Sequence, residues 1–214
     1  MAKWWSSRYD GCEHCPFPTS PIGQLATSRL YELDFLNRER PVEPRRQRLE
    51  VRFLDRRTGP DAQTRGSDTA SRGRGAFLND KRLRVSKRDK LIDGLIGTGF
   101  PFRMFEHLDA YNAMLKDLMT KCAGVRRPGA AALDLAAVAA GRYDGFWEIG
   151  LSPWDMAAGV LLVTEAGGLV TDFAGDDKFM ERGHVVAGSP KIFAQLLQLI
   201  QPHVTAKMKG QQSP

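Results

Sequence analysis

The composition of this chain changes abruptly near residue 70. In residues 1–70, six prolines interrupt any long helix or strand. The region is also rich in arginine, with eleven arginines from Arg38 to Arg74. We predict that residues 1–70 form an atypical Arg/Pro-rich segment that is disordered or not native to the fold. A folded core must then be built from the sequence that follows.

Residues 71–201 alternate between strand and helix patterns, which indicates an α/β layered domain. A hairpin is predicted over residues 75–85, around Asn79-Asp80-Lys81. The other predicted strands are 91–97, 146–149, 169–173 and 185–188, and residues 125–128 form a strand or a connector. The predicted helices are 106–122, 129–140, 153–167 and 190–200. The polar tail, residues 202–214, is predicted to be disordered.

The bulk composition excludes several classes of protein. Hydrophobic residues make up 42% of the 214 positions, which is enough for a buried core. No apolar run approaches the roughly 20 residues that cross a bilayer, and the first residues lack the apolar region of a secretory signal. Three cysteines do not build a disulfide framework. We therefore expect a cytoplasmic protein with no membrane partner.

Ser152-Pro153-Trp154-Asp155 is the first candidate for a functional site. Ser152 fits the N-cap of a helix, Pro153 fits the first helical position, and Asp155 fits the third position of a capping box. This capping role alone would explain why an aspartate occupies position 155. The same carboxylate could bind a cation such as Mg²⁺, which prefers oxygen ligands, and a helix N-terminus favours a nearby anion. Both interpretations of Asp155 are open at this point.

Two further segments accompany that motif. Glu148 lies on a predicted strand, where it is either a solvated edge residue or a carboxylate turned into a site to accept hydrogen bonds from substrate hydroxyls. Gly129, Ala130 and Ala131 have side chains so small that backbone N–H groups at a helix start become accessible. Tight helix packing would explain these small residues equally well.

Other candidates are weaker. Cys12-Glu13-His14-Cys15 has the spacing of a redox pair or half a zinc site, but prolines follow where a helix should begin. A zinc site needs two more ligands, and His14 cannot easily share an ion with both neighbouring cysteines. His107 and His184 are single histidines, which are more often surface or core residues than ligands.

The ordered motifs together resemble the inositol monophosphatase family of Mg²⁺-dependent sugar phosphatases, in its bacterial branch. The resemblance runs from about Thr69 to Ile200. The matching segments are Arg74-Gly75-Ala76-Phe77-Leu78-Asn79, Gly97-Thr98-Gly99-Phe100-Pro101, Arg127-Pro128-Gly129-Ala130-Ala131-Ala132, Asp144-Gly145-Phe146-Trp147-Glu148, Trp154-Asp155-Met156-Ala157-Ala158-Gly159 and Glu165-Ala166-Gly167-Gly168.

The resemblance implies roles for individual residues. Asp155 matches a metal-binding aspartate, Glu148 matches a glutamate that contacts an inositol hydroxyl, and Gly129, Ala130 and Ala131 match the lining of the substrate pocket. The implied fold is a layered α-β-α-β-α sandwich, and the implied cofactor is Mg²⁺. The implied reaction is attack of a metal-activated water on the phosphate monoester of inositol or a related sugar. The resemblance assigns no catalytic side chain in this chain, and it implies a homodimer.

This sequence departs from the family pattern upstream of residue 69. The family's other metal ligands lie in a Glu-Glu pair and an Asp-Pro-x-Asp-Gly-Thr motif, and neither occurs here. Tyr9-Asp10-Gly11 is the nearest remnant. We interpret the break near residue 70 as a coding frame shift or a mispredicted start joined to a truncated family sequence. One carboxylate cannot hold two or three cations, so we expect impaired activity.

A non-catalytic role is the alternative. Some bacterial relatives join the transcription antitermination machinery on ribosomal RNA, as the resemblance also implies. The basic arm from Arg38 to Arg74 could add affinity for RNA by releasing counterions. The two hypotheses differ in whether Mg²⁺-dependent phosphate release or salt-dependent RNA binding is observed.

Overall fold

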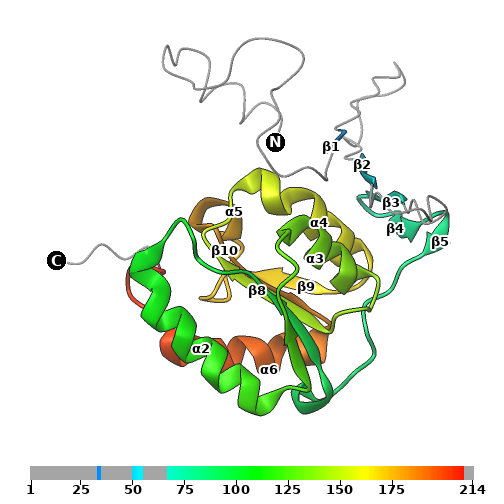
Figure 1. Ribbon diagram of the computed structural model, residues 1–214. Coiled ribbons are helices and arrows are strands. Elements are labelled where there is room, and N and C mark those ends of the chain that lie inside the picture. Colours follow the sequence, from blue (N-terminus) through cyan, green and yellow to red (C-terminus); the bar gives the residue numbers. More distant parts are fainter. Residues whose placement is uncertain (1–32, 35–49, 55–66, 210–214) are drawn as a thin grey trace, which may run out of the picture.

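The computed structural model describes residues 33–34, 50–54 and 67–209 (Figure 1). Its first sheet is an antiparallel meander in which each strand pairs with the next along the chain. Its strands are β1 (Leu33–Asp34), β2 (Glu50–Leu54), β3 (Ser67–Ser71), β4 (Gly75–Leu78) and β5 (Lys81–Arg82).

The second sheet has the strand order β7-β6-β8-β10-β9. The strands β6 and β7 are parallel, as are β6 and β8, whereas β10 runs antiparallel to both of its neighbours. The carboxyl ends of β6, β7 and β8 therefore lie at one edge of the sheet. The strands are β6 (Leu95–Thr98), β7 (Gly124–Arg126), β8 (Gly145–Ile149), β9 (Leu169–Thr171) and β10 (His184–Gly188).

Helices cover both faces of the second sheet (Figure 1). Helices α2 (Leu108–Lys121) and α6 (Pro190–Ile200) lie on one face. Helices α3 (Ala131–Ala139) and α4 (Pro153–Glu165) lie on the other, and α4 also contacts β3 and β4 of the first sheet. The layers follow the order α-β-α-β, which confirms the predicted α/β layered fold. A further helical layer is absent from the described residues.

Two hydrophobic clusters separate these layers. The cluster between α2, α6 and the second sheet is built from large side chains, including Tyr111, Trp147 and Phe173. The cluster around α3 and α4 uses many alanines. Close packing explains the difference, because a Cβ on Gly159 would lie 2.4 Å from the Cβ of Leu135. Small residues let α3 and α4 approach one another between the two sheets.

The predicted hairpin forms β4 and β5, with Asn79 and Asp80 at its tip. Both tip residues have positive φ, 47° and 64°, the combination of a two-residue turn with a type I′ backbone. At the other end of β4, the carboxylate of Glu165 accepts hydrogen bonds from the N–H groups of Gly73 (2.6 Å) and Gly75 (2.8 Å). The C-terminal end of α4 is thereby fastened to the turn between β3 and β4.

Several element boundaries differ from the sequence prediction. The predicted strand 91–97 begins as a 3₁₀ turn, η1 (Leu91–Asp93), before β6, and η2 (Phe105–His107) precedes α2. The sequence did not predict the short helix α5 (Phe179–Arg182) or the strand pairing of β2 within residues 1–70.

The part of the predicted tail that is described packs against the protein. It contains η3 (Gln201–His203), and Met208 is only 2% exposed. No helix in the described ranges is long and apolar enough to span a bilayer.

Candidate functional site

A cavity of about 380 Å³ opens where the carboxyl ends of the parallel strands β6, β7 and β8 meet. Ligands in open α/β sheets commonly bind at this edge. All five residues predicted from the sequence line this cavity: Gly129, Ala130, Ala131, Glu148 and Asp155. The other lining residues are Phe100, Phe102, Arg103, Arg127, Ala132, Ile149, Gly150, Leu151 and Trp154.

Asp155 occupies the third position of α4 and forms the predicted capping box with Ser152. The N–H of Ser152 donates to Oδ2 of Asp155 over 3.0 Å. Within the described part of the chain, the structure records no partner for Oδ1. The two interpretations of Asp155 are therefore compatible, because one oxygen caps the helix while the carboxylate also lines the cavity.

Strand alternation places Glu148 in the cavity. Trp147 and Ile149 point into the cluster beneath α2 and α6, whereas Phe146 points toward α3 and α4. Glu148 therefore shares the face of Phe146, toward the N-terminal ends of α3 and α4. It is not a solvated edge residue, because β8 lies between β6 and β10 in the sheet.

The surroundings of Glu148 disfavour its charged form. Burial, together with the negative charges of Asp134 and Asp155, raises the pKa of this carboxyl to about 8. The positive charge of Arg127 offsets part of this effect. At neutral pH, Glu148 is therefore largely protonated, so it can donate one hydrogen bond to a hydroxyl and accept another.

Asp134 is a buried acid that the sequence analysis missed. It lies in the first turn of α3 and is 2% exposed, and no other described residue hydrogen-bonds to its Oδ2. Burial raises its pKa to about 7, against the lowering influence of Arg127. An acid among the alanines of this helix could have been noticed in the sequence, but its burial could not.

Arg127 brings a positive charge to the wall of the cavity. Its guanidinium carbon lies 4.8 Å from the ring centre of Phe100 and 5.2 Å from that of Phe102, so two aromatic rings hold it. A Cβ on Gly129 would lie 3.4 Å from Nη1 of Arg127, and Gly129 has a φ of +100°, a conformation that favours glycine. The backbone conformation, more than the contact with the arginine, therefore favours glycine at residue 129.

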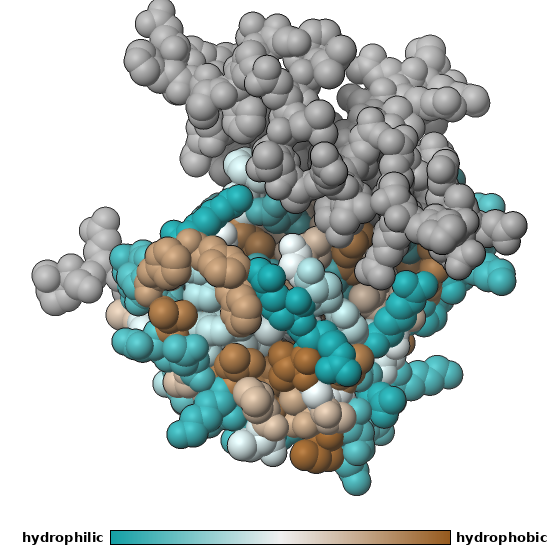
Figure 2. Space-filling view, in the orientation of Figure 1, coloured by the Kyte–Doolittle hydropathy of each residue, from teal (hydrophilic) through white to brown (hydrophobic). Residues whose placement is uncertain are grey.

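Apolar side chains gather beside the cavity, around the N-terminal end of α2 (Figure 2). The exposed members of this apolar patch are Phe100, Phe102, Phe105 and Leu108. A contiguous exposed patch of large hydrophobic residues is typical of a surface that contacts another molecule.

The described residues do not complete a binding site for Mg²⁺. Among them, no group of three or more His, Cys, Asp or Glu side chains lies close enough to hold a metal ion. Asp155 offers one oxygen, whereas Mg²⁺ usually takes one or two carboxylates together with water and substrate phosphate. The cavity therefore contains at most part of the coordination shell that the family resemblance implies.

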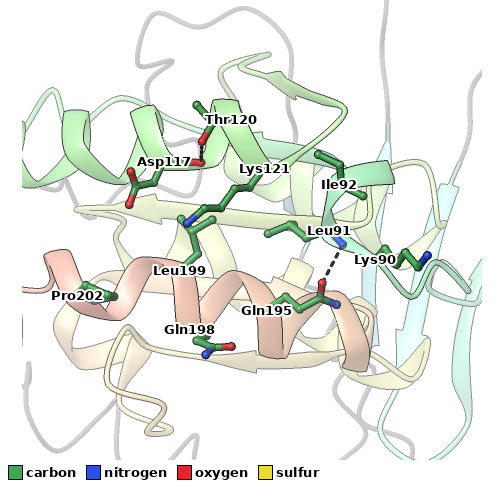
Figure 3. A pocket seen from close by; sticks show the side chains of 10 residues that line it. All are labelled: Lys90, Leu91, Ile92, Asp117, Thr120, Lys121, Gln195, Gln198, Leu199 and Pro202. Atoms are coloured by element: carbon green, nitrogen blue, oxygen red, sulfur yellow. Dashed lines mark hydrogen bonds between the residues drawn. The ribbon is translucent and has the colours of Figure 1, made fainter.

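A second cavity, of about 620 Å³, lies between α2, α6 and η1 (Figure 3). It contains none of the predicted site residues. Its one carboxylate, Asp117, already contacts Nε2 of His203 at 2.8 Å, and Gln195 accepts a hydrogen bond from the N–H of Leu91. Because it lacks converging acids, we do not treat it as the site of chemistry.

His107 and His184 meet in the structure, although the sequence showed no cluster. Both are buried, and their rings lie edge to face with centres 5.5 Å apart. His184 also stacks on Phe173, and its Nδ1 has no hydrogen-bond partner in the described ranges. These are core histidines, as the sequence suggested. Cys12, Cys15 and Tyr9-Asp10-Gly11 lie outside the described residues.

Comparison with known proteins gives a consistent family. A model of the inositol monophosphatase family matches residues 65–205. The Nus factor SuhB of Pseudomonas aeruginosa is 62% identical over 143 residues, which cover 66% of this chain and 53% of that protein. The inositol-1-monophosphatase of Mesorhizobium japonicum is 50% identical over 139 residues, which cover 65% of this chain and 52% of that protein.

Solved structures agree with these matches. The extragenic suppressor protein suhB from Bartonella henselae superposes with a TM-score of 0.66 at 41% identity, covering 72% of this chain and 57% of that one. The inositol monophosphatase from Anabaena gives a TM-score of 0.65 at 35% identity, covering 72% and 58%. The chain spans about half the length of the curated relatives it matches.

Proposed function

Because this chain belongs to the inositol monophosphatase family, we propose that its cavity binds the phosphate monoester of inositol or a related sugar. One observation carries the proposal. Glu148 on β8, Asp155 on α4 and the small residues at the start of α3 come from three elements and line one cavity.

Each part of the cavity has a chemical role in this proposal. The protonated Glu148 exchanges hydrogen bonds with a ring hydroxyl. Gly129, Ala130 and Ala131 leave room for a substrate at the N-terminal end of α3, which favours a phosphate. Asp155 supplies one oxygen ligand to Mg²⁺. In the hydrolysis reaction, Mg²⁺ would activate water and stabilise the leaving oxygen.

We further propose that Mg²⁺-dependent hydrolysis by this chain is impaired. The described residues leave the coordination shell incomplete, and the sequence lacks the upstream acidic motifs. Phosphate release from inositol monophosphate should therefore be slow even at high Mg²⁺ concentration. Rapid hydrolysis at low Mg²⁺ concentration would contradict impairment while leaving the location of the site intact.

Substitutions in the cavity test the site itself. Asp155→Asn should abolish residual phosphate release and weaken Mg²⁺ binding measured by calorimetry, whereas Glu148→Gln should weaken binding of inositol monophosphate. The matched control is Asp109→Asn, because Asp109 is an exposed acid in the first turn of α2 that does not line the cavity. If all three variants bind Mg²⁺ and substrate as the parent does, the cavity is not the site.

The apolar patch next to the cavity supports a homodimer as the working assembly. Phe102 is 60% exposed and Phe105 is 67% exposed, and burying such side chains against a second copy would be favourable. Sedimentation of the chain at several concentrations tests this, with Phe102→Ser together with Phe105→Ser as the variant expected to remain monomeric.

A second function is favoured by the names of the relatives. Several similar proteins carry the name Nus factor SuhB, which is a transcription-related role. We propose that this chain also takes RNA or the transcription machinery as a partner. The basic arm from Arg38 to Arg74 is one candidate contact, although most of it lies outside the described residues. Weaker RNA binding with a shallower salt dependence on deletion of residues 1–66 would support that assignment.

A further inference from the structure

The positive charge of this chain is concentrated in one described segment. Residues 72–90 contain eight basic and two acidic residues, a net charge of +6. The whole chain also has a formal charge of +6, so the other residues carry no net charge between them. We name this segment the basic ridge, with the basic members Arg72, Arg74, Lys81, Arg82, Arg84, Lys87, Arg88 and Lys90.

All eight basic side chains of the ridge are exposed. Arg72 and Arg74 lie in the turn before β4, Lys81 and Arg82 form β5, and the rest follow an extended stretch that leads to η1. Figure 1 shows this stretch descending along one edge of the molecule, and Figure 2 shows hydrophilic side chains projecting from the same edge. The basic side chains of the ridge are therefore carried by one segment that runs along one edge of the molecule.

Contacts with the folded core hold the ridge in place. The N–H of Val85 donates a hydrogen bond to the carbonyl oxygen of Ala166 over 3.2 Å. The backbone of residues 84–86 packs closely against Gly141. A Cβ built on Gly141 would lie 3.2 Å from the carbonyl oxygen of Arg84. The exposed residue next to Gly141 is Arg142, which adds another positive charge at this point.

Few of these charges are neutralised by acids. Asp144 pairs with Arg88 at 3.3 Å, and Glu165 is bonded to the turn that carries Arg74. The two acids of the segment do not pair with its basic residues in the described structure. Asp89 pairs at 2.8 Å with Lys191, which lies outside the ridge, and Asp80 lies at the hairpin tip. Arg88 is the one basic residue of the ridge with an ion pair among the described residues.

We propose that the basic ridge binds the phosphodiester backbone of a nucleic acid, with RNA as the partner. The inference deepens the second proposed function and is independent of the phosphatase cavity. A row of exposed cations that have few acidic partners among the described residues gains affinity for a polyanion by releasing condensed counterions. Contacts of this kind fix a backbone without reading its bases, so the binding depends strongly on salt and weakly on sequence.

Charge reversal on the ridge tests the proposal in the full chain. Arg74→Glu, Lys81→Glu and Lys87→Glu are combined, because these side chains are exposed and form no ion pair with another described residue. The control combines Lys116→Glu, Lys178→Glu and Lys209→Glu, which are exposed and lie elsewhere. Both triple variants change the net charge equally. Thermal melting confirms that each is folded, and fluorescence anisotropy measures binding of a labelled 20-nucleotide single-stranded RNA between 50 and 400 mM salt.

The ridge variant should bind RNA about 100-fold more weakly at 0.1 M salt. The slope of log K against log salt should also be shallower by about 2, because three contacts are lost and each phosphate contact on a single strand contributes about 0.7. The control should behave like the parent chain. Equal losses in both variants, or no loss in the ridge variant, would overturn the proposal.

Binding of other polyanions distinguishes RNA from DNA and anionic lipid as the ligand of the basic ridge. Single-stranded DNA of the same sequence should bind with the same salt slope, because the backbone phosphates are shared, and RNA should bind at least as tightly. Vesicles rich in anionic lipid that bind more tightly than RNA, with the same loss in the ridge variant, would overturn RNA as the partner. Asp155→Asn should leave RNA binding unchanged, so failure of the ridge and failure of the cavity are distinguishable.

Discussion

Gly99 lies directly against the carboxyl group of Glu148. A Cβ built on Gly99 would be 2.0 Å from Oε1 and 2.1 Å from the carboxyl carbon, far inside van der Waals contact. Gly99 follows the carboxyl end of β6, and Glu148 lies near the end of the neighbouring strand β8. The missing side chain at residue 99 is therefore what lets the acid turn into the cavity.

A methyl group at this place should remove Glu148 from the cavity. We expect Gly99→Ala to weaken binding of inositol monophosphate about tenfold, a change of about 1.4 kcal/mol, because the carboxyl group must move away. Calorimetric titration measures the change. The control is Gly124→Ala, where the nearest side-chain atom would be 3.4 Å away. Unchanged affinity in Gly99→Ala would show that the substrate does not contact Glu148.

Asp134 should make the protein less stable as the pH rises. The unfolded chain loses this proton near pH 4, whereas burial holds it in the folded protein until about pH 7. Between these values the folded state binds more protons, so stability falls with rising pH, by up to about 4 kcal/mol. Asp134→Asn should remove that loss and be more stable than the parent at pH 8.

Urea unfolding at pH 5 and pH 8 gives the free energy of unfolding of the parent and of Asp134→Asn. The values are comparable if the dependence of that free energy on urea concentration is the same in both proteins. If the parent and Asp134→Asn lose equal stability between the two pH values, Asp134 is not the group responsible.

His184 should have the opposite effect in acid. Burial lowers the pKa of this histidine to about 4, and the neighbouring His107 contributes to the lowering. The unfolded chain gains a proton near pH 6.5 and the folded protein only near pH 4, so stability falls as the pH decreases between these values, by up to about 3 kcal/mol.

Replacing His184 with an aromatic residue that does not titrate isolates this effect. His184→Phe preserves a ring to stack on Phe173 and removes the buried Nδ1 that lacks a partner. We expect the variant to retain its stability at pH 5 better than the parent in thermal melting. An equal fall in melting temperature with decreasing pH in the two proteins would show that His184 is not the group responsible.

The approach of α3 to α4 should depend on Gly159. Alanine favours helices over glycine by about 1 kcal/mol, so an exposed site would be stabilised by the change. Here the new methyl group would meet Cβ of Leu135 at 2.4 Å, an atom that cannot rotate away. We expect Gly159→Ala to lose about 2 kcal/mol of stability in urea unfolding. A variant as stable as the parent would show that the two helices can separate without cost.

The sequence predicted the local features of the site well. The capping box of Ser152 and Asp155 depends on residues three apart, and the tip of the hairpin depends on Asn79 and Asp80, so the order of residues is enough to find them. The α/β layering followed from the alternation of patterns. The proposed roles of the five cavity residues are still predictions, although the structure places all five around one cavity.

The features that the sequence did not predict are long-range ones. Arg127 and Phe100 follow different strands, and their contact arises only because β6 and β7 are parallel neighbours. His107 and His184 are far apart along the chain and meet through the packing of α2 against the sheet. The burial of Asp134 likewise depends on elements outside its own helix. No local pattern contains this information.

Helix α4 joins two carboxylates with different tasks. Its 13 residues make a rod about 20 Å long. Asp155 near its first turn faces the cavity, and Glu165 at its last residue grips the turn before β4. A displacement of the first sheet would therefore be transmitted to the cavity directly, because a single uninterrupted helix connects the two.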